Sequence, residues 1–342
     1  MMLQPKTTCL IATGGPGHES VVSLVSAGYA FKNMPSWVRP LFLVFNQQEE
    51  VCLFEDFSFC TVDGNLARLH EDIPFFPLHR LPELLKQFSI EVSSKIIVFQ
   101  AIHGHLGEDG SIVDRMKVFG WPVTGFSAQS SMVCFDKVLT KLILSSKGIP
   151  VVPYRWYLAH EQNLKRPFSG PVFVKPAREG SSVGVLRVSE SDDFNQALDE
   201  AFKFDHKVLV EPEILGRELE VAVLKTKTGW QASPVGEISK STWYSFSEKY
   251  LSTTKTSTGL VRDLSEDTIN RIRSMAIEVV TVLEGSGFAR VDFFLSDQGE
   301  LFVNEVNTIP GMTGISMFPW LWEQAGVSGL QLMDTILREC AG

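Results

Sequence analysis

The sequence lacks long apolar runs and is poor in cysteine. No stretch approaches the roughly 18 consecutive apolar residues that a membrane-spanning helix needs, and the apolar run near the amino terminus is too short for a secretion signal. The cysteines are odd in number and form no C-x-x-C pair, a pattern typical of reduced thiols in the cytosol. We therefore expect a soluble cytoplasmic protein without a membrane partner. The cysteines are Cys9, Cys52, Cys60, Cys134 and Cys340.

Positive charge is also in deficit. The chain has 31 Lys and Arg against 40 Asp and Glu, a net charge of -9, which argues against a nucleic-acid partner. Anionic small molecules remain possible, because a few lysines in a cleft can outweigh the overall sign. No internal repeat, low-complexity tract or linker interrupts the 342 residues, whose 44% hydrophobic content is enough for two or three packed units.

The amino-terminal region predicts a strand, a glycine turn and a helix. Residues 8–13 are apolar, residues 14–17 read Gly-Gly-Pro-Gly, and a helical pattern covers residues 21–34. Such a turn can hold an anion at the helix amino terminus, although it is neither the G-x-G-x-x-G fingerprint nor a Walker motif. Glu19 has two interpretations: it stabilises the helix dipole, or it faces a cleft and binds an ammonium group.

Further strands at residues 41–45 and 94–101 alternate with helices at 82–87 and 112–118, which predicts a doubly wound domain ending near residue 125. The second of these strands ends in a polar cluster that begins with His103. Open α/β sheets bind ligands at the carboxyl ends of their strands. His103 is either a buried, hydrogen-bonded loop residue, the commoner outcome for a single histidine, or part of a site formed with its polar neighbours.

A glycine- and serine-rich loop lies between two predicted strands in the middle of the chain. Residues 172–176 form the first strand and carry Lys175, residues 177–184 form the loop, and residues 185–188 form the second strand. Amides and hydroxyls of such a loop can fold over a polyphosphate, and a plain surface loop is the alternative. Helices over residues 127–147 carry Lys137.

The carboxyl-terminal region predicts a β-hairpin around the turn 297–299. Period-two geometry puts Arg290, Asp292 and Phe294 on one face, and Val303, Glu305 and Asn307 on the same side of the partner strand. Asp292, Glu305 and Asn307 are hard oxygen ligands whose spacing suits Mg²⁺, unless the hairpin is simply solvated. The polar and aromatic segment 243–260 has the length and composition of an active-site lid.

Several motifs follow one another in a fixed order and are more specific together than singly. They are GGPGHESVVSL, HGHLGEDG, FDKVLTK, VFVKPAREGSSVGV, GRELEVAVL, PVGEI, EKYLS, ARVDFFL and NEVNTIPGMT. In this order they resemble the ATP-grasp superfamily, and along nearly its entire length the sequence is similar to the D-alanine–D-alanine ligases. The resemblance implies an α/β fold: a Rossmann-like substrate-binding domain at residues 1–125, a central α+β ATP-binding subdomain at 126–218, and a carboxyl-terminal α+β subdomain with lid and metal site at 219–342.

The resemblance also implies roles for individual residues, carried over only where the motifs match. It implies ATP as a substrate, two Mg²⁺ ions for which Mn²⁺ can substitute, and a homodimer. The ATP contacts would be Lys137 and Lys175 at the α- and β-phosphates, Lys249 near the γ-phosphate, and Glu211 and Glu218 at the adenine and ribose. The catalytic set would be Glu19, Ser181, Tyr250, Arg290 and the amide of Gly311. The metals would be held by Asp292, Glu305 and Asn307. Glu19 and His103 would bind the first D-alanine, and Ser316 and Met317 would bind the second.

The sequence departs from the family pattern at a few positions. Pro212 stands where a side chain usually covers the adenine, Ser20 replaces the usual arginine after Glu19, and Met317 occupies a position where leucine is common. A leucine-to-methionine change conserves volume. The sequence therefore predicts an ATP-dependent ligase of two D-alanines for peptidoglycan precursor synthesis. The alternatives are a related ligase using D-serine, D-lactate or another amino acid as second substrate, and a nucleotide-binding homologue without turnover.

Overall fold

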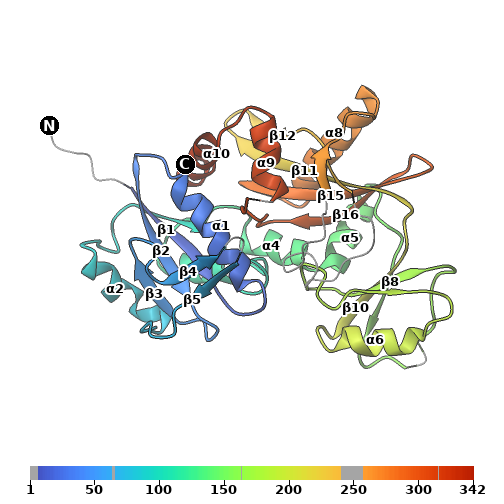
Figure 1. Cartoon of the computed structure of the whole chain (residues 1–342), viewed down its shortest axis with the longest axis horizontal. Coiled ribbons are helices and arrows are strands. Elements are labelled where there is room, and N and C mark those ends of the chain that lie inside the picture. Colours follow the sequence, from blue (N-terminus) through green and yellow to red (C-terminus); the bar gives the residue numbers. More distant parts are fainter. Residues whose placement is uncertain (1–6, 64–65, 163, 240–256, 315) are drawn as a thin grey trace.

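The computed structural model describes residues 7–63, 66–162, 164–239, 257–314 and 316–342. Three larger sheets, built in chain order, organise these residues (Figure 1), and β4 (Cys60–Asp63) and β5 (Leu66–Leu69) form a separate two-stranded sheet. The amino-terminal sheet lies on the left of the view, the central sheet at the lower right and the carboxyl-terminal sheet above it, with helices α4 (Ala128–Phe135) and α5 (Lys137–Ser146) in the middle. Within the described residues, no helix is long and apolar enough to cross a membrane.

The amino-terminal sheet has the strand order β3-β2-β1-β6, in which β1 pairs in parallel with both β2 and β6. All eight residues of β1 are buried, as expected for a strand covered on both faces. Cys9 and Ile11 pack with Leu24 of α1, whereas Leu10 packs with Ile112 of α3 on the opposite face. The elements are β1 (Thr7–Gly14), α1 (Ser20–Lys32), β2 (Val38–Phe45), β3 (Val51–Phe54), β4 (Cys60–Asp63), β5 (Leu66–Leu69), the 3₁₀ helix η1 (Leu78–Arg80), α2 (Leu81–Gln87), β6 (Ile96–Gln100) and α3 (Ser111–Lys117).

The central sheet is antiparallel, with the order β7-β10-β8-β9. Along β10, Val208 and Val210 face the core formed with α6, whereas Leu209 packs with Val138 of α5 on the other face. This alternation leaves Lys207 and Glu211 on the side of α5. The elements are α4 (Ala128–Phe135), α5 (Lys137–Ser146), β7 (Arg155–Leu158), β8 (Val172–Pro176), β9 (Leu186–Val188), α6 (Phe194–Phe202) and β10 (Lys207–Pro212).

The carboxyl-terminal sheet has the order β14-β13-β11-β15-β16, and β12 pairs with β11. Helix α8 covers one face through Ile272, Ala276 and Val279, which pack among the buried side chains of β11 and β15. The elements are β11 (Gly216–Thr226), β12 (Gly229–Ala232), β13 (Gly236–Ser239), β14 (Ser257–Leu260), α8 (Glu266–Val282), β15 (Phe288–Ser296), β16 (Leu301–Asn307), α9 (Met317–Gln324) and α10 (Gly329–Ala341).

The predicted hairpin is confirmed as β15 and β16, but one expectation about its faces is wrong. Arg290 lies opposite Asn307 and Asp292 opposite Glu305, after which the register shifts and Phe293 pairs with Val303. The shift is a β-bulge at Asn304, which breaks the simple alternation of faces. Val303 therefore does not share the face of Glu305 but is 1% exposed in the core with Phe293.

Candidate active site

A row of carboxylates crosses the carboxyl-terminal sheet. Glu220 on β11 pairs with Asp292 on β15, which pairs with Glu305 on β16. Residues directly opposite one another on antiparallel strands place their side chains on the same face. Three acidic side chains therefore lie side by side at one level of the sheet. Their mutual repulsion makes a bound cation favourable at this level.

Arg290 neutralises part of this negative charge. Its Nε and Nη2 donate hydrogen bonds of 2.7 Å each to the two oxygens of Asp292, and Nε lies 3.3 Å from Oε2 of Glu220. Burial lowers the pKa of Arg290, but Asp292 and Glu220 more than offset burial and hold that pKa well above its usual value. A permanently charged guanidinium thus stands in the middle of the ribbon.

The predicted metal ligands lie together at this ribbon. Asp292 and Glu305 are opposite each other, and Asn307 follows on the same strand, where its Oδ1 accepts a hydrogen bond of 3.0 Å from the amide of Ile309. In the described part of the chain, no three His, Cys, Asp or Glu side chains form a preassembled metal cluster. The oxygen-only donors and the excess of carboxylates nevertheless fit Mg²⁺, and the metal site stays a prediction.

Helix α5 directs Lys137 at the carboxylate row. Its Nζ lies 3.7 Å from Oε2 of Glu305 and donates a hydrogen bond of 2.5 Å to the backbone oxygen of Glu179 in the glycine- and serine-rich loop. Asp136 caps the helix by accepting hydrogen bonds from the amides of Val138 and Leu139, a common way to begin a helix. Lys137 thereby joins the loop to the hairpin.

Lys175 and Glu211 meet on the inner face of the central sheet. Nζ of Lys175 lies 2.5 Å from Oε2 of Glu211, and Nζ of Lys141 lies 2.6 Å from Oε1 of the same carboxylate. The Lys141 contact lacks the angles of a hydrogen bond, so we treat it as an ion pair. Lys141 was not predicted as a site residue, although its spacing of four from Lys137 puts both on one face of a helix.

Glu19, just before α1, and Ser181, in the loop between β8 and β9, are in contact although they lie far apart in the sequence. The Ser181 hydroxyl donates a hydrogen bond of 2.5 Å to Oε1 of Glu19. Two glycines make room for this carboxylate: a Cβ at Gly104 would lie 2.6 Å from Oε2, and one at Gly180 would lie 3.2 Å from it. Burial and the nearby charge of Glu108 raise the pKa of Glu19, and the Ser181 hydrogen bond opposes that rise.

His103 is 4% exposed and is held by hydrogen bonds, as the first of its two interpretations predicts. Its Nε2 lies 2.9 Å from the hydroxyl of Ser26, and its amide donates to the hydroxyl of Ser23 at 2.9 Å. Ser26 also accepts a hydrogen bond of 3.0 Å from the amide of Met312. His103 thus lies where α1 meets the loop after β16, and a substrate contact from it stays a prediction.

Three further predicted residues, Gly311, Ser316 and Met317, lie between β16 and the first turn of α9. The Ser316 hydroxyl accepts a hydrogen bond of 2.9 Å from the amide of Thr313 and lies 2.8 Å from where a Cβ on Gly311 would be. Met317 is 5% exposed, and its Cε lies 2.2 Å from where a Cβ on Gly236 would be. Met317 thus packs closely over Gly236 where α9 lies against β13.

The remaining predicted site residues are Glu218 on β11 and Lys249 and Tyr250 in the predicted lid. Glu218 lies on β11 opposite Ile238 and Phe294, two residues before the carboxylate row. Lys249 and Tyr250 lie outside the described residues, as does most of the predicted lid 243–260.

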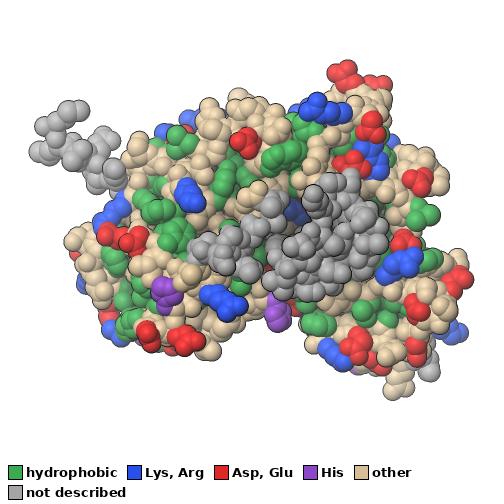
Figure 2. Space-filling view, in the orientation of Figure 1, with side chains coloured by type: hydrophobic (Ala, Val, Ile, Leu, Met, Phe, Trp, Pro, Cys, Tyr) green, Lys and Arg blue, Asp and Glu red, His purple; other side chains and the backbone are tan. Residues whose placement is uncertain are grey.

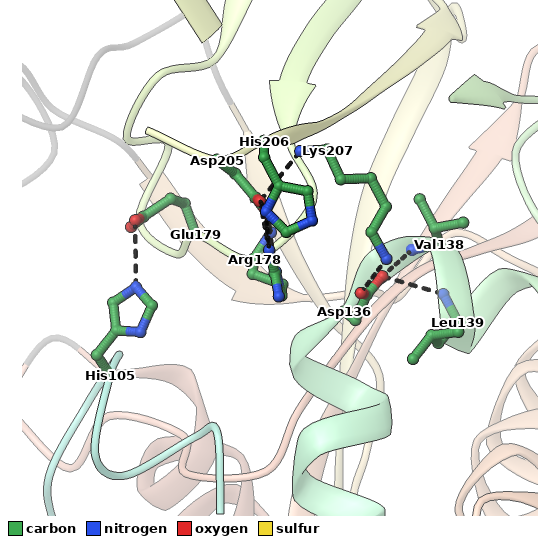
Figure 3. Close-up of polar contacts among 9 residues, drawn as sticks. All are labelled: His105, Asp136, Val138, Leu139, Arg178, Glu179, Asp205, His206 and Lys207. Carbon is green, nitrogen blue, oxygen red and sulfur yellow. Dashed lines mark hydrogen bonds and ion pairs between the residues drawn. The ribbon is translucent and has the colours of Figure 1, made fainter. Parts of the chain in front are cut away.

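Polar contacts between elements lie around the glycine- and serine-rich loop, residues 177–184 (Figure 3). The Arg178 side chain donates two hydrogen bonds to Asp205, from Nε at 3.0 Å and from Nη2 at 2.6 Å. Burial raises the pKa of Asp205, but these hydrogen bonds and the amide of Lys207 leave that pKa below its usual value. His105 reaches across from the amino-terminal region to Glu179, 3.4 Å away. Sequence patterns give no signal for such pairs, because their members are far apart in the chain.

Comparison with known proteins identifies relatives of the whole chain. The family model described as D-ala D-ala ligase C-terminus matches residues 143–338. A D-alanine–D-alanine ligase of Oceanobacillus iheyensis is 37% identical over 341 residues, which cover 96% of this chain and 93% of that protein. The structure of the D-alanine–D-alanine ligase from Coxiella burnetii superposes with a TM-score of 0.79 at 28% identity, covering 98% of this chain and 95% of that one. A D-Ala:D-Ser ligase from Enterococcus faecalis superposes with a TM-score of 0.76 at 27% identity, with 97% and 99% coverage.

Proposed function

The chain belongs to the D-alanine–D-alanine ligase family and has its ATP-grasp fold, and from this premise we propose that it joins two D-alanines into D-alanyl-D-alanine for peptidoglycan precursor synthesis. One ATP is converted to ADP and phosphate in each cycle. The observation that carries the proposal is the approach of α5 to the hairpin, where Nζ of Lys137 lies 3.7 Å from Oε2 of Glu305. A cation suited to phosphate stands there beside the proposed metal ligands.

The first step is phosphoryl transfer. A carboxylate oxygen of one D-alanine attacks the γ-phosphorus of ATP, the bond to the bridging oxygen breaks, and ADP leaves an acyl phosphate behind. Such transfers depend on positioning and charge neutralisation. Lys137 and Lys175 would bind the α- and β-phosphates and Lys249 the γ-phosphate. The adenine and ribose would meet Glu211 and Glu218.

The second step forms the amide bond. The amine of the second D-alanine attacks the acyl carbon, the carbon–oxygen bond to phosphate breaks, and the amine loses a proton. Arg290 and the amide of Gly311 would stabilise the negative charge on the acyl oxygen, an effect worth several kcal/mol in a water-excluded site. Tyr250, Ser181 and Glu19 would take up the proton, and the 2.5 Å bond between Ser181 and Glu19 supports the second half of this relay.

Asp292, Glu305 and Asn307 would hold two Mg²⁺ ions, for which Mn²⁺ can substitute. Bound there, the metals supply charge neutralisation at the terminal phosphates. The carboxylate row formed by Glu220, Asp292 and Glu305 supports this assignment, because it gathers hard oxygen ligands at one level of the sheet.

The substrates would lie on either side of the reacting carbon. Glu19 and His103 would bind the first D-alanine, with the Glu19 carboxylate receiving its ammonium group. Ser316 and Met317 would line the second D-alanine, and the segment 243–260 would cover the site. Residues 1–125 would serve as the substrate-binding domain, and residues 126–218 and 219–342 as the two ATP-grasp subdomains of a cytoplasmic homodimer.

Phosphate release with ATP and Mg²⁺ across a panel of D- and L-amino acids tests the proposed function. We expect turnover with D-alanine alone and D-alanyl-D-alanine as the product. Turnover that requires D-serine or D-lactate as a second substrate would contradict the second-substrate assignment and leave the ligase chemistry standing. Absence of turnover with every substrate, in a protein that still binds ATP, would contradict the enzymatic function itself.

A further inference from the structure

Glu211 is a single buried carboxylate held by two ammonium groups. It is 2% exposed, Lys141 is 1% exposed and Lys175 is 13% exposed. Each lysine takes one oxygen: Lys141 lies 2.6 Å from Oε1 and Lys175 lies 2.5 Å from Oε2. Burial raises the pKa of Glu211, and the charges of the two lysines outweigh burial and leave the pKa below its usual value. The carboxylate is therefore ionised.

The two lysines differ in what surrounds them. Lys175 extends from β8 and retains some exposure, and in the proposed function its ammonium turns to the phosphates. Lys141 projects from the buried face of α5 and is enclosed. The same helix is tied to β10 by a second ion pair of opposite polarity, between Asp136 and Lys207. These two ion pairs join α5 to β10, so Lys141 is held beside Glu211 by the packing of two whole elements.

We propose that Lys141 is a positioning residue for ATP: it is the permanent counter-ion of Glu211 and thereby frees Lys175 to bind phosphate. This inference rests on the proposed function, in which Lys175 contacts the nucleotide. An ionised carboxylate at 2% exposure is costly to leave unpaired. Without Lys141, the Lys175 ammonium would be the only cation beside Glu211. Either Lys175 would stay paired with Glu211 and bind phosphate poorly, or Glu211 would take up a proton whenever Lys175 moved to the phosphates of ATP.

The charged groups around Glu211 are few. Lys141 faces it from α5 and Lys175 from β8, and Glu305 on β16 acts on Lys141 from farther away. Burial lowers the pKa of Lys141, and the charge of Glu211 opposes that change. The protonation of Lys141 and that of Glu211 depend on each other, so loss of the charge on one residue alters the protonation of the other residue.

Calorimetric titration of ATP into the K141M variant at several pH values tests this role. We expect ATP affinity at pH 8 to fall at least about tenfold, to recover as the pH is lowered, and to be coupled to proton uptake beyond that of the wild type. K147M is the matched control, because Lys147 is exposed at the end of the same helix, and it should bind ATP like the wild type. Unchanged affinity and proton uptake in K141M would overturn the inference.

A double-mutant cycle separates this role from general damage to the fold. In an E211Q background position 211 carries no negative charge to be paired, so we expect K141M to reduce ATP affinity far less than it does with Glu211 present. An equal loss of ATP affinity in the two backgrounds would contradict the role. If K141M alone does not fold, K141R replaces it in the titration: an arginine keeps a cation beside Glu211, so K141R should bind ATP with the proton uptake of the wild type, and uptake beyond the wild type would contradict the role. Smaller uptake in E211Q would show that Glu211 is protonated on binding. Failure of the wild type to bind ATP would instead overturn the proposed function.

Discussion

At the scale of the residue, the charged side chains that meet at the hairpin of β15 and β16 form the centre of the proposed site. Glu305 is the residue that connects the two halves of the site, because it faces Asp292 across the strands and approaches Lys137 from α5. Its side chain is 35% exposed, so it contributes little to the packed core. The role of Glu305 can therefore be tested without disturbing the fold.

The E305A substitution should lower kcat/KM roughly 100-fold or more, the scale of losing one preorganised electrostatic group. We also expect Mn²⁺ binding, followed by electron paramagnetic resonance, to weaken. The free energy of unfolding should stay within about 0.5 kcal/mol of the wild type, as for other substitutions outside the core. N304A at the neighbouring β-bulge is the control and should keep normal metal binding. Wild-type metal affinity in E305A would show that Glu305 is not a metal ligand.

At the scale of the element, the sequence predicts those strands and helices whose periodicity is strong. Residues 8–13, 172–176 and 290–307 were recognised as β1, β8 and the hairpin. Four-residue strands such as β7 and β13 were missed, because so short a run carries little periodic signal. The bulge at Asn304 could not be predicted either, since it depends on how β16 pairs with β15 and not on the residues of one strand.

Long-range side-chain contacts between elements were also beyond prediction. Lys141 packs against Glu211, 70 positions away in the sequence, and only the docking of α5 on β10 makes their charges neighbours. His105 and Glu179 are a further case, in which a loop of the amino-terminal region touches the glycine- and serine-rich loop. Such pairs follow from the packing of whole elements.

The contact between His105 and Glu179 predicts a small pH dependence of stability. The hydrogen bond that His105 donates to Glu179 raises the pKa of His105 against the effect of its burial, with Asp109 adding to the rise and Arg178 opposing it. A raised histidine pKa stabilises the folded state below the unfolded value near 6.5 and loses this effect as the pH rises through the folded value.

The H105Q variant should therefore melt below the wild type at pH 6 and match it at pH 8.5. The difference should stay under about 1 kcal/mol, because His105 is 54% exposed and solvent screens the pair. H79Q, a change at an exposed histidine on η1, is the control and should not alter the pH profile. A difference that grows with rising pH would show that the neutral form of His105 makes the stabilising contact.

At the scale of the whole molecule, the sequence predicts the fold through the order of its motifs, and the relatives confirm the family. Its acidic charge is mixed with basic side chains over the face shown in Figure 2, in keeping with a small-molecule substrate. The three sheets bring Glu19 and Ser181, Lys137 and Glu305, and Lys175 and Glu211 together from separate regions. In the proposed function, these three contacts would place the amino acid, the phosphates and the metals next to one another.

The most direct test of this account follows an oxygen atom through the reaction. D-alanine labelled with ¹⁸O in its carboxylate, supplied with ATP and Mg²⁺, should yield phosphate carrying one ¹⁸O for each D-alanyl-D-alanine formed, because the attacking carboxylate oxygen leaves with the phosphate. Mass spectrometry of the released phosphate gives the answer. Unlabelled phosphate accompanying dipeptide formation would contradict the acyl-phosphate route on which the assigned roles of these residues depend.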